Sequence, residues 1–333
     1  MQNERSEILI SQFGSASQLQ KSENSFSTDL KNDEVLIDVK YSGINFADIM
    51  MRLGLYPDAP PKPFIPGYEV SGVISQVGSS VNDFKVGDEV MAGSRFGGYV
   101  SKLVVPEWQV VKKPSHLSME EAAATPVNFI TAHLAMNEFG RVRRGDKVLI
   151  DCATGGVGVF CLQMAQTLGA ECIGLTSTPA KKEFILSYGA KAYTFEEFEK
   201  SDENNFNFIL NSTGGKKVKD LFKRLDKAGQ LTCIGLQATI HNGKTSLPRK
   251  LKAVLQTPFY HLIQLMQNSK SVSGFNALKF FDDKRWMINI MKELESSTYK
   301  PHVGKVFAAS DVTKAHEFIE TRQAKGKVLL KWS

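Results

Sequence analysis

Three glycines stand between two apolar stretches in the middle of the chain. Residues 148–150 are Val, Leu and Ile, which is typical of a short buried strand. A turn with Gly155, Gly156 and Gly158 follows, and apolar residues then recur at helical spacing over 159–165. A strand, a glycine turn and a helix in this order can bring backbone N–H groups to a pyrophosphate. The segment therefore predicts a dinucleotide-binding turn, with an ordinary strand–turn–helix corner as the alternative.

The next expected strand ends without an acidic residue. Sites that prefer NAD carry Asp or Glu about 20 residues past the glycine turn, where the carboxylate bonds the ribose 2′-hydroxyl. Here residues 175–182 read LTSTPAKK. The hydroxyls of Ser177 and Thr178 and the ammonium of Lys181 can receive a 2′-phosphate instead. We therefore predict a preference for NADPH; the alternative for Lys181 is a solvated residue in the first turn of a helix.

The composition is typical of a globular protein with two domains. Of the 333 residues, 42% are hydrophobic and 23% are charged, and the net charge is +6. This mild positive charge favours an anionic ligand. The densest basic run, residues 247–252, lacks the interleaved aromatic residues of a nucleic-acid site, so no nucleic acid is expected. No apolar run reaches the ~20 residues of a membrane span, and the first ten residues lack a secretory signal.

The cysteines indicate a reducing compartment. They lack paired spacing, and they fall in expected core elements. The four are Cys152, Cys161, Cys172 and Cys233. We therefore expect free thiols and a cytoplasmic location.

The two parts of the chain differ in their patterns. Residues 34–40 alternate as a half-buried strand does, and glycine and proline punctuate residues 43–98, which fits a compact β domain. Ser118 and Glu121 have capping-box spacing at the start of an expected helix, which is interrupted near Pro126. Strands and helices then alternate, which predicts an α/β domain with a doubly wound parallel sheet. Its expected strands are 147–153, 171–177, 207–213, 230–236 and 272–276.

A long connection at 239–270 interrupts this alternation. Residues 251–266 are apolar and are expected to be helical around Pro258. They either pack against the sheet or form a lid or an apolar contact surface. A helix at 285–296 and a strand–helix–strand at the end of the chain complete the expected elements.

Six motifs carry a family resemblance along nearly the whole chain. In order, they are YSGINFADIMMRLGLYP, FIPGYEVSGVI, VGDEVMA, AAATPVNFITAHLA, VLIDCATGGVG and GKVLL. The chain resembles the medium-chain dehydrogenase/reductase superfamily, in particular its zinc-free quinone oxidoreductase branch and the vesicle amine transport protein 1-like subgroup. This resemblance implies a Rossmann domain at 127–299, inserted into a GroES-like β-barrel catalytic domain of residues 1–126 and 300–333. The active site is expected in the cleft between them.

The zinc ligands of the superfamily's alcohol dehydrogenases have no counterpart here. Those enzymes place a Cys after the first core strand and a His-Glu pair after a glycine. Here GINFAD holds no thiol, and Tyr68 of Gly67-Tyr68-Glu69 stands where the histidine would be. Zinc needs three or four close ligands, and the six histidines are isolated. We predict no metal, and hence reduction of an already activated acceptor.

Four residues match family positions at the catalytic site. The resemblance implies that Asn45 donates to, or orients, the acceptor oxygen on which negative charge develops. Asp48 would fix the loop, and Tyr56 would donate a hydrogen bond, or a proton through water. Thr131 would lie on a helix that lines the cleft. The alternative is that Asn45 and Asp48 only cap a turn.

The resemblance also extends the set of cofactor contacts. One family contact, a Tyr or His after the third strand, has no clean counterpart, and Glu196 falls near its place. The expected NADPH contacts are Tyr56, Gly155, Gly156, Val157, Gly158, Ser177, Thr178, Lys181, Gly235, Leu236, Phe275, Asn276 and Arg322.

The predicted function is hydride transfer from NADPH to a small hydrophobic quinone or α,β-unsaturated carbonyl compound. Two alternatives stay open: enoyl reduction on a lipid or polyketide intermediate, and a non-catalytic role in NADPH binding or lipid handling. The family also implies a homodimer that pairs the last Rossmann strands, here near residues 272–276.

Overall fold

The protein forms two compact units in a computed structural model that describes residues 3–236 and 255–332. Unit 1 combines residues 1–130 with 278–333, and unit 2 comprises residues 131–277. The basic run 247–252 and the first residues of the expected helix 251–266 lie outside the described residues.

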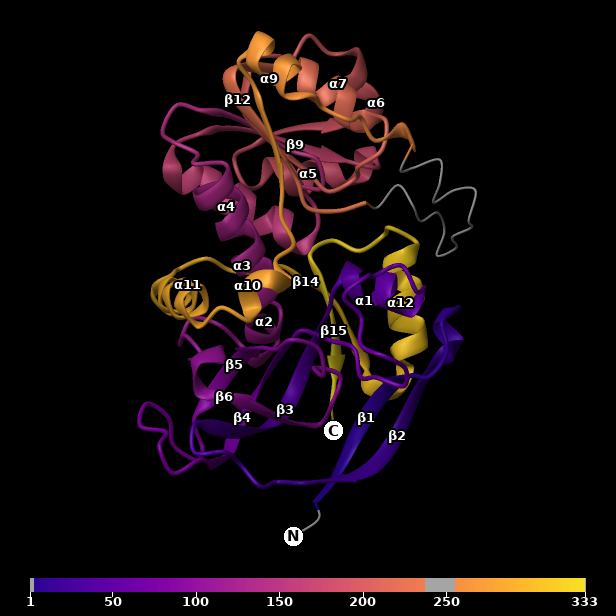
Figure 1. Cartoon of the computed structure of the whole chain (residues 1–333), viewed down its shortest axis with the longest axis vertical. Helices are drawn as coiled ribbons and strands as arrows, with labels where there is room; N and C mark the ends of the chain where they lie inside the picture. Colours follow the sequence, from indigo (N-terminus) through magenta and orange to yellow (C-terminus); the bar gives the residue numbers. More distant parts are fainter. Residues whose placement is uncertain (1–2, 237–254, 333) are drawn as a thin grey trace. The chain divides into compact units, whose positions relative to one another are not determined.

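Unit 1 is a β domain, as its glycine- and proline-rich sequence predicts, and its strand pairs are antiparallel except for β14 and β15, which are parallel. Its main sheet has the order β14-β15-β3-β4-β5-β7, with β6 paired to β3, and β1 and β2 form a separate hairpin (Figure 1). The strands are β1 (Asn3–Ile10), β2 (Leu19–Phe26), β3 (Glu34–Ile44), β4 (Glu69–Val77), β5 (Glu89–Gly93), β6 (Lys102–Pro106), β7 (Val110–Lys112), β14 (Val303–Ala308) and β15 (Lys327–Lys331). Alternate residues of β3, Val35, Ile37 and Val39, enter the core of the unit.

The helices of unit 1 begin where local capping allows. Ser118 Oγ accepts from the Glu121 N–H at 3.1 Å, and a Glu121 carboxylate oxygen accepts from the Ser118 N–H at 2.7 Å, so the predicted capping box is confirmed. The expected interruption is also present, because Pro126 begins a new helix. The helices are α1 (Phe46–Arg52), α2 (Met119–Ala123), α10 (Leu278–Phe281), α11 (Lys284–Ser296), α12 (Val312–Glu320) and the first part of α3 (Pro126–His133), whose last three residues belong to unit 2.

The boundary between the units differs from the expected one near residue 299. Residues 278–299 belong to unit 1, although the sequence analysis places them in the Rossmann domain. The physical reason is packing: α11 buries Met287, Ile290 and Leu294 and lies against β7 and the short helix that precedes it.

Unit 2 is a doubly wound parallel sheet, so the predicted fold class is confirmed. Its order is β10-β9-β8-β11-β12-β13, the order of a Rossmann sheet. The strands are β8 (Lys147–Ile150), β9 (Glu171–Thr176), β10 (Lys191–Thr194), β11 (Phe206–Asn211), β12 (Leu225–Cys233) and β13 (Ser271–Gly274). The helices are α4 (Gly156–Leu168), α5 (Lys182–Leu186), α6 (Phe195–Lys200), α7 (Lys217–Lys223) and α9 (Leu262–Asn268).

Helices cover both faces of this sheet (Figure 1). Leu149, Ile173 and Leu231 pack with α6 and α7 in one core cluster, while α4 lies against β8 and β9. The strand β13 is at the edge of the sheet, and the homodimer expected to form through it stays a prediction.

Two further expectations concern the chain as a whole. None of the four cysteines forms a disulfide in the described part of the chain, and Cys161 and Cys172 are buried. Among the described residues, no helix is long and apolar enough to cross a membrane. The cytoplasmic location stays a prediction.

Candidate functional site

The glycine turn joins β8 to α4 with very little space. A Cβ at Gly158 would lie 2.3 Å from the Cys152 carbonyl oxygen and 2.7 Å from the Ala153 Cα, closer than real Cβ atoms approach. Gly174 of β9 is also tightly placed, because a Cβ there would lie 2.7 Å from the Ala153 Cβ. The methyl group of Ala153, at the first position of the fingerprint, therefore fits because residue 174 of the neighbouring strand is a glycine.

The N-terminus of α4 has free hydrogen-bonding capacity. The residue at its N-cap, Gly155, has no side chain that could accept from the first-turn N–H groups. The helix has 13 residues, and its aligned peptide dipoles place partial positive charge at this end. A phosphate group fits such a helix start, and the glycine turn allows the backbone to approach it.

The turn lies at the point where the strand order of the sheet reverses, between β8 and β11. In open parallel sheets, ligands bind at this point, beyond the carboxyl ends of the strands. A pocket of about 470 Å³ lies along α6 and α7 in unit 2. Asp151, Leu175 and Asn211, which stand at or just past the ends of β8, β9 and β11, line part of it, but none of the predicted cofactor residues does.

Asp151 ties together the loops on both sides of this point. Its carboxylate is 1% exposed and accepts from the Ser212 N–H at 2.9 Å, the Ser212 hydroxyl at 2.6 Å, the Asn211 side-chain amide at 2.7 Å and the Thr213 N–H at 3.0 Å. The sequence analysis did not single out Asp151. An acidic residue directly after a buried strand and before a glycine turn was the available signal.

The end of β9 contains the residues expected at a 2′-phosphate. Ser177 and Thr178 are exposed, whereas Lys181 is only 7% exposed in the short 3-10 turn Pro179–Lys181. The alternative interpretation of Lys181 as a solvated residue is therefore wrong. The buried hydroxyl of Thr176 has no hydrogen-bond partner within the described part of the chain. A polar ligand at this strand end would find several hydrogen-bonding groups.

Other expected cofactor residues of unit 2 also follow strand ends. Gly235 and Leu236 come after β12, and a Cβ at Gly235 would lie 2.7 Å from the Ser212 carbonyl oxygen. Phe275 and Asn276 come directly after β13. Because the sheet is parallel, all four lie at the same edge as the glycine turn.

Three expected residues lie outside the cofactor sheet. Tyr56 of unit 1 packs edge-on against Tyr68, with 6.5 Å between ring centroids. Arg322 is exposed just past the end of α12, and its φ is +59°. Thr131 lies within α3 and is 8% exposed.

Asp48 is a buried hydrogen-bond acceptor at the start of α1. One carboxylate oxygen accepts from the Gly67 N–H at 2.9 Å, and the other accepts from the Asn45 N–H at 2.7 Å and the Tyr99 hydroxyl at 3.1 Å. Burial raises the pKa of Asp48 to about 7, although these hydrogen bonds and the charge of Lys327 act in the opposite direction. Asp48 thus holds the backbone around Asn45 in place, and its role at a catalytic site stays a prediction.

The side chain of Asn45 makes contacts of its own. Its Nδ2 donates to Glu69 Oε1 at 3.1 Å, and its Oδ1 accepts from Lys327 Nζ at 2.6 Å. Lys327 also forms an ion pair with Glu69. The interpretation that Asn45 only caps a turn is therefore incomplete, because its carboxamide belongs to a buried charged network. Glu69 and Lys327, the lysine of the GKVLL motif, are not among the site residues predicted from the sequence.

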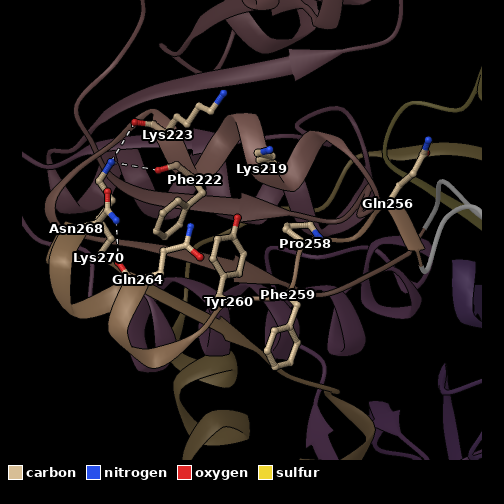
Figure 2. Close-up of a pocket in the computed structure, with 10 residues that line it drawn as sticks. All are labelled: Lys219, Phe222, Lys223, Gln256, Pro258, Phe259, Tyr260, Gln264, Asn268 and Lys270. Carbon is tan, nitrogen blue, oxygen red and sulfur yellow. Dashed lines mark hydrogen bonds between the residues drawn. The ribbon is translucent and has the colours of Figure 1, made fainter.

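A second pocket, of about 550 Å³, lies elsewhere in unit 2 between α7 and α9 (Figure 2). Phe222 and Tyr260 face each other in it, with 4.6 Å between ring centroids. None of the predicted site residues lines it. The residues that line it are Lys219, Phe222, Lys223, Gln256, Pro258, Phe259, Tyr260, Gln264, Asn268 and Lys270.

The described part of the apolar segment is only partly packed. Tyr260 and Leu265 contact the core of unit 2, while Phe259, Leu262 and Met266 are exposed. Packing against the sheet therefore holds for Tyr260 and Leu265, and the lid or contact surface expected as the alternative stays a prediction. Within residues 3–236 and 255–332, no group of three or more His, Cys, Asp or Glu side chains could hold a metal ion.

Two family models match this chain. Residues 31–115 match the alcohol dehydrogenase GroES-like domain, and residues 183–330 match the zinc-binding dehydrogenase model. Among solved structures, the quinone oxidoreductase of Escherichia coli, complexed with NADPH, has a TM-score of 0.84 and 25% identity, covering 98% of this chain and 99% of that one. The human synaptic vesicle membrane protein VAT-1 homolog-like protein has a TM-score of 0.83 at 24% identity, covering 98% of each chain.

Curated relatives in sequence are again VAT-1 homologues and quinone oxidoreductases. The synaptic vesicle membrane protein VAT-1 homolog of Rattus norvegicus is 30% identical over 310 residues, which are 89% of this chain and 76% of the relative. The Danio rerio homolog is 32% identical over 314 residues, and the match spans 90% of this chain but only 64% of that relative. A probable quinone oxidoreductase of Schizosaccharomyces pombe is 29% identical over 333 residues, covering 97% of this chain and 96% of the relative. The chain therefore belongs to the medium-chain dehydrogenase/reductase superfamily, in the branch that contains the quinone oxidoreductases and the VAT-1 homologues.

Proposed function

We propose that this chain is an oxidoreductase that uses NADPH to reduce a quinone or an α,β-unsaturated carbonyl compound. The observation that carries the proposal is the glycine turn, where Gly158 is held against the Cys152 carbonyl and α4 begins without a side-chain cap. The likeness to an E. coli quinone oxidoreductase complexed with NADPH supports the same cofactor.

The residues of unit 2 fit NADPH. The backbone of residues 155–158 would hold the pyrophosphate, and Ser177, Thr178 and Lys181 would hold the 2′-phosphate. No carboxylate stands between residues 175 and 182 to repel that phosphate. Phe275 and Asn276, with the backbone of residues 235–236, would contact the nicotinamide end. Tyr56 and Arg322 are proposed as further contacts from unit 1.

NADPH, when bound, supplies the hydride. The protein must stabilise the oxygen of the acceptor as negative charge develops on it, and Asn45 would do so by donating an amide N–H. Asp48 would keep the loop of Asn45 in place through its three hydrogen bonds. Tyr56 would donate a second hydrogen bond or a proton through water, and Thr131 would contact the substrate.

An acceptor panel tests this function. NADPH consumption should be measured at saturating cofactor with 1,4-benzoquinone, 9,10-phenanthrenequinone and a short enal. We expect turnover with at least one acceptor. Absence of turnover with all three, together with binding of fatty acids or liposomes, would reject the reductase and favour the lipid-handling alternative. If none of the three acceptors is reduced but an enoyl thioester assayed in the same way is, the enoyl reductase would be favoured.

Replacing Lys181 by alanine should weaken NADPH binding by about tenfold and leave NADH binding unchanged. The reason is that one charge-assisted contact to the 2′-phosphate, worth about 1.4 kcal/mol, would be lost. Fluorescence titration with both cofactors measures this effect. Lys182→Ala is the matched control, because Lys182 pairs with Glu197 at 3.0 Å. An equal loss for NADPH and NADH would show that Lys181 does not select the cofactor.

A further inference from the structure

We propose that Lys327 and Glu69 are positioning residues that fix the carboxamide of Asn45 in one orientation. In this orientation one amide N–H remains for the oxygen of the substrate. The inference rests on the proposed function, which it deepens by naming the residues that prepare the hydrogen-bond donor. Neither residue is itself proposed to touch the substrate.

The orientation of the carboxamide follows from the chemistry of its two neighbours. An ammonium group has donors only, and an ionised carboxylate has acceptors only. Lys327 Nζ lies 2.6 Å from Asn45 Oδ1, and Glu69 Oε1 lies 3.1 Å from Asn45 Nδ2. A flipped amide would place its NH₂ group against the ammonium and its oxygen against the carboxylate. Both neighbours therefore select the same orientation.

The pair that selects the orientation is itself held firmly. The side chain of Glu69 is fully buried and that of Lys327 is 4% exposed, and the two form an ion pair. The second oxygen of Glu69 accepts from the Val127 N–H at 2.8 Å, in the first turn of α3. A Cβ at Gly43 would lie 2.5 Å from Glu69 Oε1, so a glycine is needed for the carboxylate to occupy this place.

Stability alone is a weak reason for such a pair. Replacing a buried ion pair by apolar residues of similar volume is often neutral or even stabilising, because desolvation offsets the attraction. The pair instead occupies one acceptor site of the Asn45 carboxamide oxygen and one of its two N–H groups. No described residue accepts from the second amide N–H, and Asn45 is partly exposed. The ammonium on its oxygen also polarises the amide, which strengthens the remaining N–H as a donor.

A double-mutant cycle distinguishes positioning from a general structural role. We would measure kcat with 9,10-phenanthrenequinone and the Kd of NADPH for Asn45→Ala, Lys327→Met and the double variant. Each single variant should lower kcat by roughly 10- to 100-fold, with the NADPH Kd unchanged within about twofold. The double variant should be no slower than Asn45→Ala alone, because Lys327 acts through Asn45. Losses that multiply would overturn the inference.

Two further variants separate folding defects from the effect on Asn45. Lys327→Met alone leaves Glu69 buried without its charge partner, which can destabilise the fold. Glu69→Gln combined with Lys327→Met removes both charges, so its melting temperature should recover relative to Lys327→Met while kcat stays low. Recovery of kcat together with stability would show a structural role only. Lys331→Met, at an exposed position of the same strand, is the matched control and should keep the full kcat.

Crystal structures supply a test that needs no turnover. In the unaltered protein, Asn45 should keep one side-chain conformation, with its nitrogen toward Glu69. In the Glu69→Gln/Lys327→Met variant the carboxamide should rotate or occupy two conformations. An identical conformation in both proteins would overturn the positioning role. If the side chain moves as expected but the unaltered protein reduces no acceptor, the proposed function fails and the positioning role stands.

Discussion

Replacing Gly158 by alanine is expected to weaken NADPH binding more than about tenfold and to lower the free energy of unfolding by about 3 kcal/mol. The new methyl group would lie 2.3 Å from the Cys152 carbonyl oxygen and 2.7 Å from two backbone atoms of Ala153. These are backbone atoms rather than the ends of flexible side chains, so relief requires α4 to move away from the turn. That movement would displace the N–H groups proposed to hold the pyrophosphate.

Gly155→Ala, three residues earlier in the same turn, is the control. A Cβ at Gly155 would lie 3.5 Å from the Cys152 carbonyl oxygen, which is ordinary contact, and its φ of −86° suits any residue. The stability of this variant should stay within about 0.5 kcal/mol of the unaltered protein. Urea unfolding of both variants, with NADPH titration of Gly158→Ala against the unaltered protein, provides the comparison. If Gly158→Ala is as stable as Gly155→Ala and binds NADPH as tightly as the unaltered protein, close packing of the turn is not what requires glycine.

The strands of unit 2 could be predicted because most of them carry apolar runs. Residues 148–150 and 208–210 lie in the centre of the sheet, where both faces are covered, so their sequences are continuously apolar. The strand β10 was missed, since its sequence KAYT is short and begins with lysine. It lies at the edge of the sheet, where pairing with β9 rather than its own hydrophobicity makes it a strand.

The candidate site could be predicted only where its residues are local in sequence. The glycine turn and the β9 end are each one short segment, so their types and spacing carry the signal. Asn45, Glu69 and Lys327 are far apart in the chain and meet because β3 pairs with both β4 and β15. The register of such long-range pairs cannot be obtained from the local pattern of a single sequence. The contact between Ala153 and Gly174 is hidden for the same reason.

A hydrogen-bonded chain connects Asp48 to the interior of unit 1. The Tyr99 hydroxyl lies 3.1 Å from an Asp48 carboxylate oxygen and 3.2 Å from His316 Nε2, and His316 Nδ1 has no partner in the described structure. Burial lowers the pKa of His316 to about 3, so this ring is neutral at ordinary pH. With a neutral ring beside it, Tyr99 can donate to an ionised Asp48 or accept from a protonated one. The chain therefore accommodates both protonation states of Asp48.

We expect titration of Asp48 to make the free energy of unfolding of the unaltered protein depend on pH. The Asp48→Asn variant should lack this contribution. Burial raises the pKa of Asp48 from 3.8 to about 7. Between these values the folded protein keeps a proton that the unfolded chain has released, so the contribution is complete below about pH 4 and is lost as the pH rises through 7. Its size is up to about 4 kcal/mol.

Urea unfolding of both proteins at pH 5, 6.5 and 8 measures this contribution. The stability of the unaltered protein minus that of Asp48→Asn should fall as the pH rises, because asparagine does not titrate. Subtracting the variant also removes the contributions of other groups that titrate alike in both proteins. A difference that is constant or grows with pH would mean that the donors from Asn45, Gly67 and Tyr99 keep the carboxylate ionised even at pH 5. Those hydrogen bonds would then outweigh the cost of burying the charge.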